Sequence, residues 1–178
     1  MLKRMRLYGA GGVLVAAVMS VGMVFAQEVA TAPVPPALGT AKTVFISNAG
    51  ADAGLFPHPF SGGADRGYNQ FYAMVKSWGR FELVNDPAQA DLVFELQLHA
   101  PNGPQNADKT KGASDPLPMF RLVIYDRKTH YVLWALTESI MVAYIQKTHD
   151  NNFDSALEAL TQDLKRVTGA PASTASNR

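Results

Sequence analysis

The chain has 178 residues, with 16 lysine and arginine side chains against 15 aspartate and glutamate, no cysteine, and 47% hydrophobic residues. This composition excludes a disulfide-stapled scaffold, a polybasic nucleic-acid binder and a disordered acidic chain. It is typical of a globular domain that folds around its own apolar core.

The first 26 residues have the three-part pattern of a signal peptide. Three basic residues precede an apolar run, and Val24 and Ala26 supply a small-residue cleavage site before Gln27. Cleavage there leaves 152 residues with 13 basic and 15 acidic side chains, so the net charge falls from +1 to −2. We therefore expect a periplasmic or secreted protein, and not a lipoprotein, because no cysteine is present for lipidation. The alternative is a retained membrane anchor, since the run approaches the roughly 20 residues that span a bilayer.

Composition divides the rest of the chain into three parts. Residues 27–41 contain three prolines and little periodicity, which predicts a flexible linker. Residues 170–178 are small and polar, which predicts a disordered tail. A single domain is expected over residues 42–169, and it contains no internal repeat.

The first half of this domain predicts a strand, a long loop and a helix. Residues 42–48 are apolar and β-branched, as in a strand buried on both faces, and residues 49–67 are rich in glycine and proline. Asp65 is the expected cap of a helix that ends at Gly79. Spacings of three and four give this helix an inward face of Tyr68, Phe71, Val75 and Trp78.

The second half predicts four strands and a final helix. Short strands are expected at 81–84 and 120–125, and residues 91–99 alternate apolar and polar side chains, as in a strand with one wet face. Residues 100–118 form a second polar loop. After a hairpin turn, the return strand runs from Tyr131 toward Ile145, with a bend near Glu138 and Ser139. Asn151 or Asn152 is the expected cap of a helix with an apolar stripe of Phe153, Leu157, Leu160, Leu164 and Val167.

These elements predict an α/β (α+β) fold in the order β-α-β-β-β-β-α. A single mixed sheet of about five strands with both helices on one face buries each apolar stripe and satisfies the right-handed crossover rule.

Three segments carry a resemblance to a known type of domain: Lys42–Asn48, Trp78–Phe94 and Phe120–Trp134. These segments contain a helix that ends in GRFELV, then ADLVFEL, and later YDRKT before LW. This pattern resembles the small α/β domains of exported bacterial proteins similar to the TolB amino-terminal domain. It also resembles related domains of unknown function. The resemblance covers about residues 42–169. It implies envelope assembly or protein contact and no known reaction. The chain departs from the TolB pattern in its glycine- and proline-rich first loop and in lacking a following β-propeller.

The residues that carry chemistry form no recognisable catalytic motif. The four histidines, His58, His99, His130 and His149, lack the spacing of a metal pair, and there is neither a serine-nucleophile elbow nor a phosphate-binding loop. Asp150 and Asp154 flank a helix start, where capping explains them. We therefore expect no reaction, no cofactor, no metal and no nucleic-acid partner.

The first long loop has the most binding character. Apolar rings in a loop stiffened by proline either tuck over the sheet or remain exposed for a partner. The candidate binding residues are Phe56, His58, Phe60, Tyr68 and Asn69. The leading interpretation is a binding or envelope-assembly module whose partner is another envelope protein. Two alternatives remain open: a secreted carrier of a small ligand with its pocket under the long loops, and a small hydrolase that uses His58 or His99 with Glu95.

Overall fold

The computed structural model describes residues 32–101, 118–141 and 143–169. The predicted signal peptide, residues 27–31 of the linker, the tail at 170–178 and most of the second long loop lie outside the described residues.

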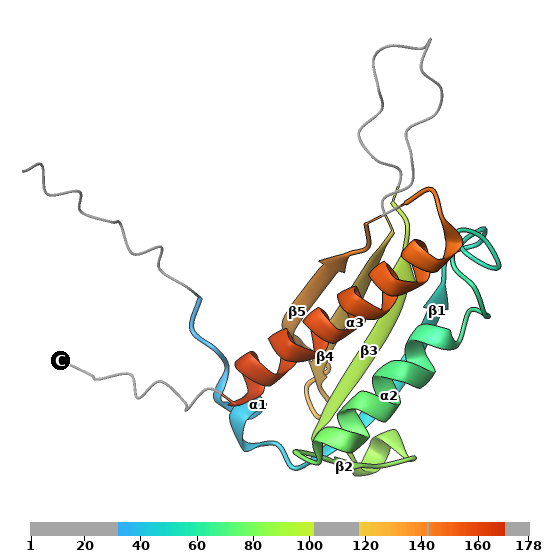
Figure 1. Ribbon diagram of the computed structural model, residues 1–178. Helices are drawn as coiled ribbons and strands as arrows, with labels where there is room; N and C mark the ends of the chain where they lie inside the picture. Colours follow the sequence, from blue (N-terminus) through green and yellow to red (C-terminus); the bar gives the residue numbers. More distant parts are fainter. Residues whose placement is uncertain (1–31, 102–117, 142, 170–178) are drawn as a thin grey trace, which may run out of the picture. The chain divides into compact units, whose positions relative to one another are not determined.

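Five strands form one mixed sheet in the spatial order β2-β1-β3-β4-β5 (Figure 1). β1 pairs in parallel with both β2 and β3, whereas β3, β4 and β5 are antiparallel to one another. The strands are β1 (Thr43–Ala51), β2 (Glu82–Leu83), β3 (Leu92–His99), β4 (Met119–Asp126) and β5 (Val132–Ser139). The mixed five-stranded sheet and the predicted order of elements are confirmed.

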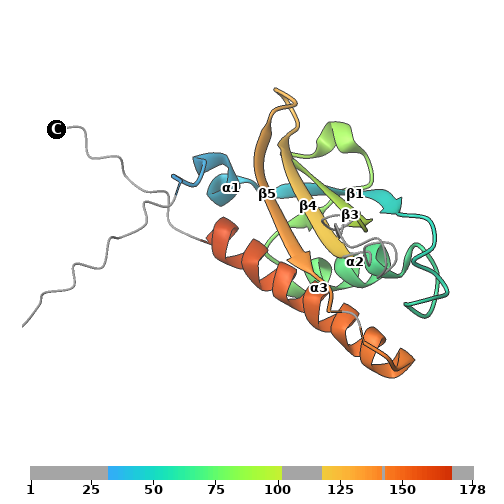
Figure 2. The same ribbon diagram turned by 90° about the horizontal axis from the view of Figure 1, so that it is seen from above.

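The two long helices, α2 (Arg66–Trp78) and α3 (Gln146–Gly169), lie on the same face of the sheet (Figure 2). Phe71 and Val75 of α2 are fully buried, and Gly79 ends the helix in the left-handed conformation at φ 69°. The apolar side chains of β3 that face the helices are buried, and the polar ones between them are half-buried. Both faces of β3 therefore match the alternation in the sequence. α3 contributes the longest buried stripe, formed by Phe153, Ala156, Leu157, Leu160, Thr161, Leu164 and Thr168.

α3 begins earlier than the capping signals predict. The expected start was Asn151 or Asn152, but the helix starts at Gln146, and Asn152 instead donates to the carbonyl of Met141. The return strand, β5, is correspondingly shorter and ends at Ser139. Its pairing with β4 shifts register opposite Ile124 and Tyr125, and not near Glu138. Tertiary contacts along α3 override the local capping preference, as is common at helix ends.

A short helix, α1 (Pro36–Thr40), replaces the end of the predicted linker. Its side chain Leu38 is fully buried in the core. The Arg80 guanidinium donates to the carbonyls of Gly39 at 2.6 Å and Ala41 at 3.1 Å. These bonds satisfy carbonyls that a helix terminus otherwise leaves unpaired. One buried leucine and one arginine thus attach this segment to the domain.

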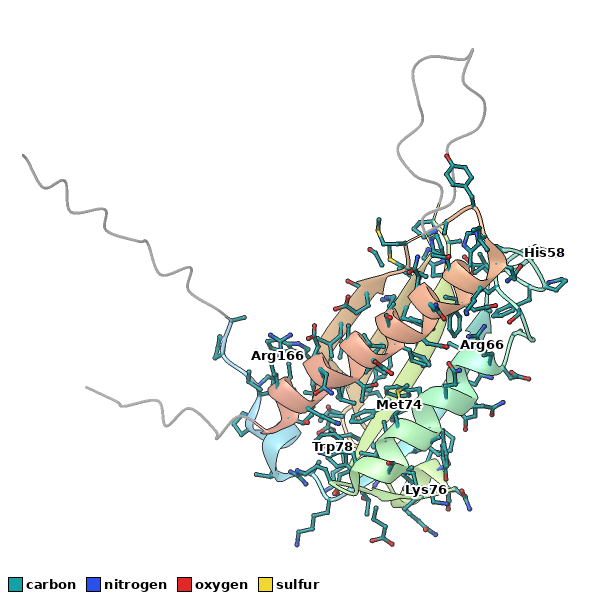
Figure 3. All side chains as sticks on the ribbon, in the orientation of Figure 1. His58, Arg66, Met74, Lys76, Trp78 and Arg166 are labelled. Carbon is teal, nitrogen blue, oxygen red and sulfur yellow. The ribbon has the colours of Figure 1, made fainter. Side chains whose placement is uncertain are left out.

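Arg66 attaches the first long loop to both helices (Figure 3). Its guanidinium donates to Asp150 at 2.5 Å and to Asp154 at 2.7 Å, and it lies 4.4 Å from the centre of the Phe153 ring. It also donates to the carbonyl of Ser61. Asp150 and Asp154 are therefore ion-pair partners inside α3 and not caps at its start.

The Asp65 side chain also differs from its predicted role. No hydrogen bond from the Asp65 side chain caps α2; its carboxylate instead accepts a bond from the Asn48 amide at 2.8 Å. Asp65 thus ties the end of the loop to β1.

Asp150 should make the stability of the fold pH-dependent. Burial alone would raise the pKa of Asp150, but the Ser61 N–H, Arg66 and Gln146 stabilise the carboxylate and lower it to about 2. Because the folded pKa lies below the unfolded value, this stabilisation is full above about pH 4 and is lost as the pH falls through 2. We expect Asp150→Asn to lower the free energy of unfolding by about 2 kcal/mol at pH 7.

Urea denaturation at pH 7, 5, 3 and 2 measures this effect. The difference between Asp150→Asn and the parent chain should be the same at pH 7 and pH 5, and should shrink at pH 3 and again at pH 2. The matched control is Glu82→Gln, because Glu82 is exposed on β2. An equal loss of stability at every pH would show that the carboxylate charge is not the cause.

Candidate binding face of the sheet

The face of the sheet opposite α2 and α3 has no described helix over it. We call this surface the open face. Its side chains come from alternate positions on β1, β3, β4 and β5, because their neighbours point into the core. It includes Phe45, Ser47, Val93, Glu95, Gln97, His99, Met119, Arg121, Val123, Tyr125, Val132, Ala135, Thr137 and Ser139.

Polar side chains of both charges lie at the centre of the open face. Gln97, Arg121 and Thr137 are cross-strand neighbours, and Arg121 is exposed. In the next row, Val123 is only 2% exposed although it lies on this face. Neighbouring side chains therefore cover Val123, so the centre of the open face is polar at its surface and apolar beneath.

Tyr125 and Glu95 form a hydrogen-bonded pair on the open face. The Tyr125 hydroxyl donates to Glu95 Oε1 at 3.2 Å. Burial raises the pKa of Tyr125, and the charge and hydrogen bond of Glu95 raise it further, while Arg121 acts in the opposite direction. Tyr125 is therefore held as a neutral donor, and Glu95 is oriented by it.

His99 and Asp52 form a second pair at the end of the open face. His99 Nδ1 lies 2.6 Å from Asp52 Oδ2, which also accepts the Ala100 N–H at 2.8 Å. The Ala100 bond is the main reason that the pKa of Asp52 is lowered, with His99 adding to it. Because an ionised carboxylate only accepts, the His99 Nδ1–H is the donor in this contact.

In the hydrolase alternative His99 was expected to work with Glu95, but its carboxylate partner in the structure is Asp52. Glu95 and His99 lie on the same strand four residues apart, a separation of roughly 13 Å. Glu95 therefore does not contact His99, and Asp52 does. The side chains of His99 and Asp52 are 40% and 34% exposed, and neither residue lines the two cavities described below.

The candidate residues of the first loop are divided between core and surface. Phe60 is fully buried against Phe153, with ring centres 5.1 Å apart. Of the two positions expected for the rings of this loop, Phe60 therefore takes the inward one and is not an exposed anchor. Phe56 is half-buried and contacts both rings. The loop turns its apolar rings inward because they complete the core between β1 and α3.

The other three candidates stay at the surface and do not form one cluster with the phenylalanines. His58 is exposed, with Nδ1 3.2 Å from the Gln146 amide oxygen. Tyr68 is half-buried against Tyr72, with ring centres 6.2 Å apart, and Asn69 is exposed on α2. A binding role for these three residues stays a prediction.

Two cavities lie away from the open face. The larger, of about 570 Å³, lies between α2 and α3 and is bordered by Met74, Trp78, Ala159 and Lys165. The smaller, of about 360 Å³, lies at the start of β1 and β3 beside Lys42, Asp91, Asp126 and Lys128. Neither is lined by an open-face residue.

The described residues contain neither a metal-binding cluster nor a membrane-spanning helix. No group of three or more histidine, aspartate or glutamate side chains is placed to hold a metal ion there. None of the helices described in the structure has the length and apolar character needed to cross a membrane.

Comparison with known proteins gives structural neighbours only. Neither a protein-family model nor a curated protein matches the sequence. A PelC dodecamer from Paraburkholderia phytofirmans is 12% identical, with 73% of this chain and 89% of that chain covered and a TM-score of 0.43. A Xanthomonas campestris protein assigned to DUF330 is 14% identical, with 77% and 91% covered and a TM-score of 0.43.

TolB, whose amino-terminal domain the sequence resembles, is also among the neighbours. TolB from Acinetobacter baumannii is 16% identical, with 74% of this chain and 29% of TolB covered, at a TM-score of 0.37. The chain thus matches less than a third of TolB. None of these values supports a transfer of activity or partner.

Removal of the Glu95 charge should lower the pKa of Tyr125. We expect one tyrosine of the parent chain to titrate above the usual value near 10, and to move toward that value in Glu95→Gln. Carbon-13 NMR of the tyrosine Cζ atoms over pH 8 to 12 measures this, with Tyr125→Phe for assignment. Glu82→Gln should leave the same resonance unchanged. An unaltered Tyr125 curve in Glu95→Gln would contradict the pairing.

Proposed function

We propose that this chain is an exported, non-enzymatic binding module that contacts another envelope protein through the open face. The observation that carries the proposal is the open face itself. It is broad, no described helix covers it, and it carries polar side chains of both charges. Neither of the two cavities described above lies on it. Ligands of small size are usually held in concave, mostly apolar pockets, whereas protein partners meet flatter polar and apolar surfaces. A protein surface therefore fits the open face better than a small molecule does.

The arrangement of charges supports recognition of a polar partner. Arg121 is exposed at the centre, Glu95 lies in the adjacent row, and the His99 and Asp52 pair lies at the end. Such mixed charges specify orientation and partner choice more than raw affinity. The Tyr125 hydroxyl already orients the Glu95 carboxylate, and the Ala100 N–H already orients the Asp52 carboxylate. Binding therefore costs little further side-chain entropy at these two residues.

The packing under the first long loop supports a protein-binding role over the carrier alternative. The first long loop fills its own interior with Leu55 and Phe60, which are 3% and 0% exposed. Under this loop, the space that a small ligand would need is occupied by side chains.

One observation favours a second candidate, a hydrolase that uses His99. The 2.6 Å contact between His99 and Asp52 is the geometry of an oriented general base. Hydrolysis of an ester or amide substrate that is abolished by both His99→Ala and Asp52→Asn would favour this candidate. Equal hydrolysis by these variants and the parent chain would exclude it.

Site-specific photo-crosslinking tests the binding proposal. A photoreactive amino acid is placed in turn at Ser47, Arg121 and Thr137 in cells that export the chain. We expect the same adduct from at least two of these positions, and none from Lys76, an exposed control on α2 (Figure 3). With the crosslinker at Ser47, which lies on β1 away from the edge of the sheet, Arg121→Glu should reduce the adduct about tenfold, because reversal of a central charge opposes a complementary partner.

The alternative outcome is equally specific. Recovery of only the free chain from all three open-face positions, or an adduct that forms at Lys76 and is unaffected by Arg121→Glu, would overturn the assignment of this face.

A further inference from the structure

The two edges of the sheet differ sharply in their protection. β2 contains only two residues, one of them Glu82, and is followed by a turn with Pro87. A short, charged strand near a proline resists edge-to-edge pairing. β5 has eight residues and pairs with β4 alone among the described strands. Residues 131–145 contain no proline, lysine or arginine, and their one charged side chain is Glu138.

Exposed apolar side chains lie at both ends of β5. The large apolar residues that are exposed in the described structure all fall within this same stretch. Tyr131 and Val132 are 74% and 55% exposed at the start of the strand, and Met141 is 72% exposed just after its end. Tyr144 and Ile145 continue this second group. Exposed apolar groups of this kind mark contact sites, and here they flank an open strand edge.

The backbone of β5 also points unpaired groups outward. The Ile140 N–H donates to the Pro118 carbonyl at 2.8 Å, so Ile140 faces β4. Because the direction alternates along a strand, the N–H and C=O groups of Ala135, Thr137 and Ser139 face away from β4. No hydrogen bond from another described residue reaches these outward groups.

We propose that a second copy of this chain pairs with β5 in antiparallel orientation, so that two sheets join edge to edge about Leu136. This proposal is independent of the partner on the open face. An antiparallel pair centred on Leu136 places the outward groups of Ala135 opposite those of Thr137 in the second copy. It also brings the exposed residues at the start of each strand, Tyr131 and Val132, toward Met141 at the end of the other, so one two-fold axis covers the apolar groups at both ends of both strands.

The charge of β5 is compatible with self-pairing in this register. Glu138 is the cross-strand neighbour of the buried Phe120, so it lies on the helix face, near Asp163 of α3. Burial against α3 raises the pKa of Glu138, the nearby Asp163 raises it further, and Arg166 opposes this. In the centred register Glu138 lies opposite Trp134 of the second copy, so the two Glu138 carboxyls do not face each other.

Sedimentation equilibrium of the mature chain, residues 27–178, tests the pairing. We expect a dimer whose dissociation constant rises at least tenfold in Thr137→Pro, which removes an outward N–H, and in Ala135→Lys, which places a charge at the edge. Thr137→Val keeps the N–H and should remain dimeric. Far-ultraviolet circular dichroism verifies that each variant is folded.

Disulfide trapping tests the register without a risk to folding. The chain has no cysteine, so a copy with Ala135→Cys mixed with a copy with Thr137→Cys has no competing thiol. Paired residues of an antiparallel ladder lie about 5.5 Å apart at Cα, which suits a disulfide. We expect oxidation to yield the mixed dimer, and a Lys76→Cys copy to yield none with either partner.

Two results would overturn the proposal. One is a monomer at every concentration together with no mixed disulfide. The other is a dimer that survives both Thr137→Pro and Ala135→Lys unchanged. Either result leaves photo-crosslinking from Arg121 unaffected, so failure of this proposal and failure of the proposed function are distinguishable.

Discussion

The ring of Phe153 is the point at which the separate parts of this domain meet. It contacts Phe120 of β4, with ring centres 4.9 Å apart, Phe60 of the first loop, and the Arg66 guanidinium of α2. At Gly67 a side-chain Cβ would lie 3.0 Å from Phe120 and 3.5 Å from Phe153, so α2 approaches the rings this closely only because glycine is there. Loss of a buried phenylalanine ring usually costs about 3 to 5 kcal/mol.

This packing decides which surfaces remain for function. Because the first loop contributes Leu55 and Phe60 to the core, these two side chains stabilise the domain and are not exposed to a partner. Both long helices lie on the face that contains these rings. The opposite face therefore keeps its polar side chains, and β5 pairs with β4 alone among the described strands.

Much of the architecture could be predicted from the sequence because it depends on local periodicity. The alternation in residues 91–99 and the stripe from Phe153 to Leu164 are each sufficient to assign an element and its buried face. The first turns of α3 were missed because asparagine is a strong local signal for a helix start, while Gln146 becomes helical through contacts with Pro59 and Asp150. The segment around Leu38 was missed because five residues are too few to show a period.

The candidate site was less predictable because its contacts join distant parts of the chain. Asp52 and His99 are 47 residues apart, and their contact depends on the parallel register of β1 and β3. The pairing of Glu95 with Tyr125 across β3 and β4 was likewise beyond a local pattern, although both residues were placed in strands. No spacing rule predicts such pairs. The rings of Phe56 and Phe60 show the same limit, since a proline-rich loop has the same composition whether it folds inward or outward.

The open face and the β5 edge would act together in an assembled protein. Strands that join through β5 form one sheet, so the open faces of two copies would lie side by side and present two copies of Arg121 and of the His99 and Asp52 pair. A partner that engages both would bind the second site at a high effective concentration, which raises overall affinity without any new contact. A weak polar surface on one copy can then support a stable assembly, because pairing at the edge adds a second contact to the one that each open face makes by itself.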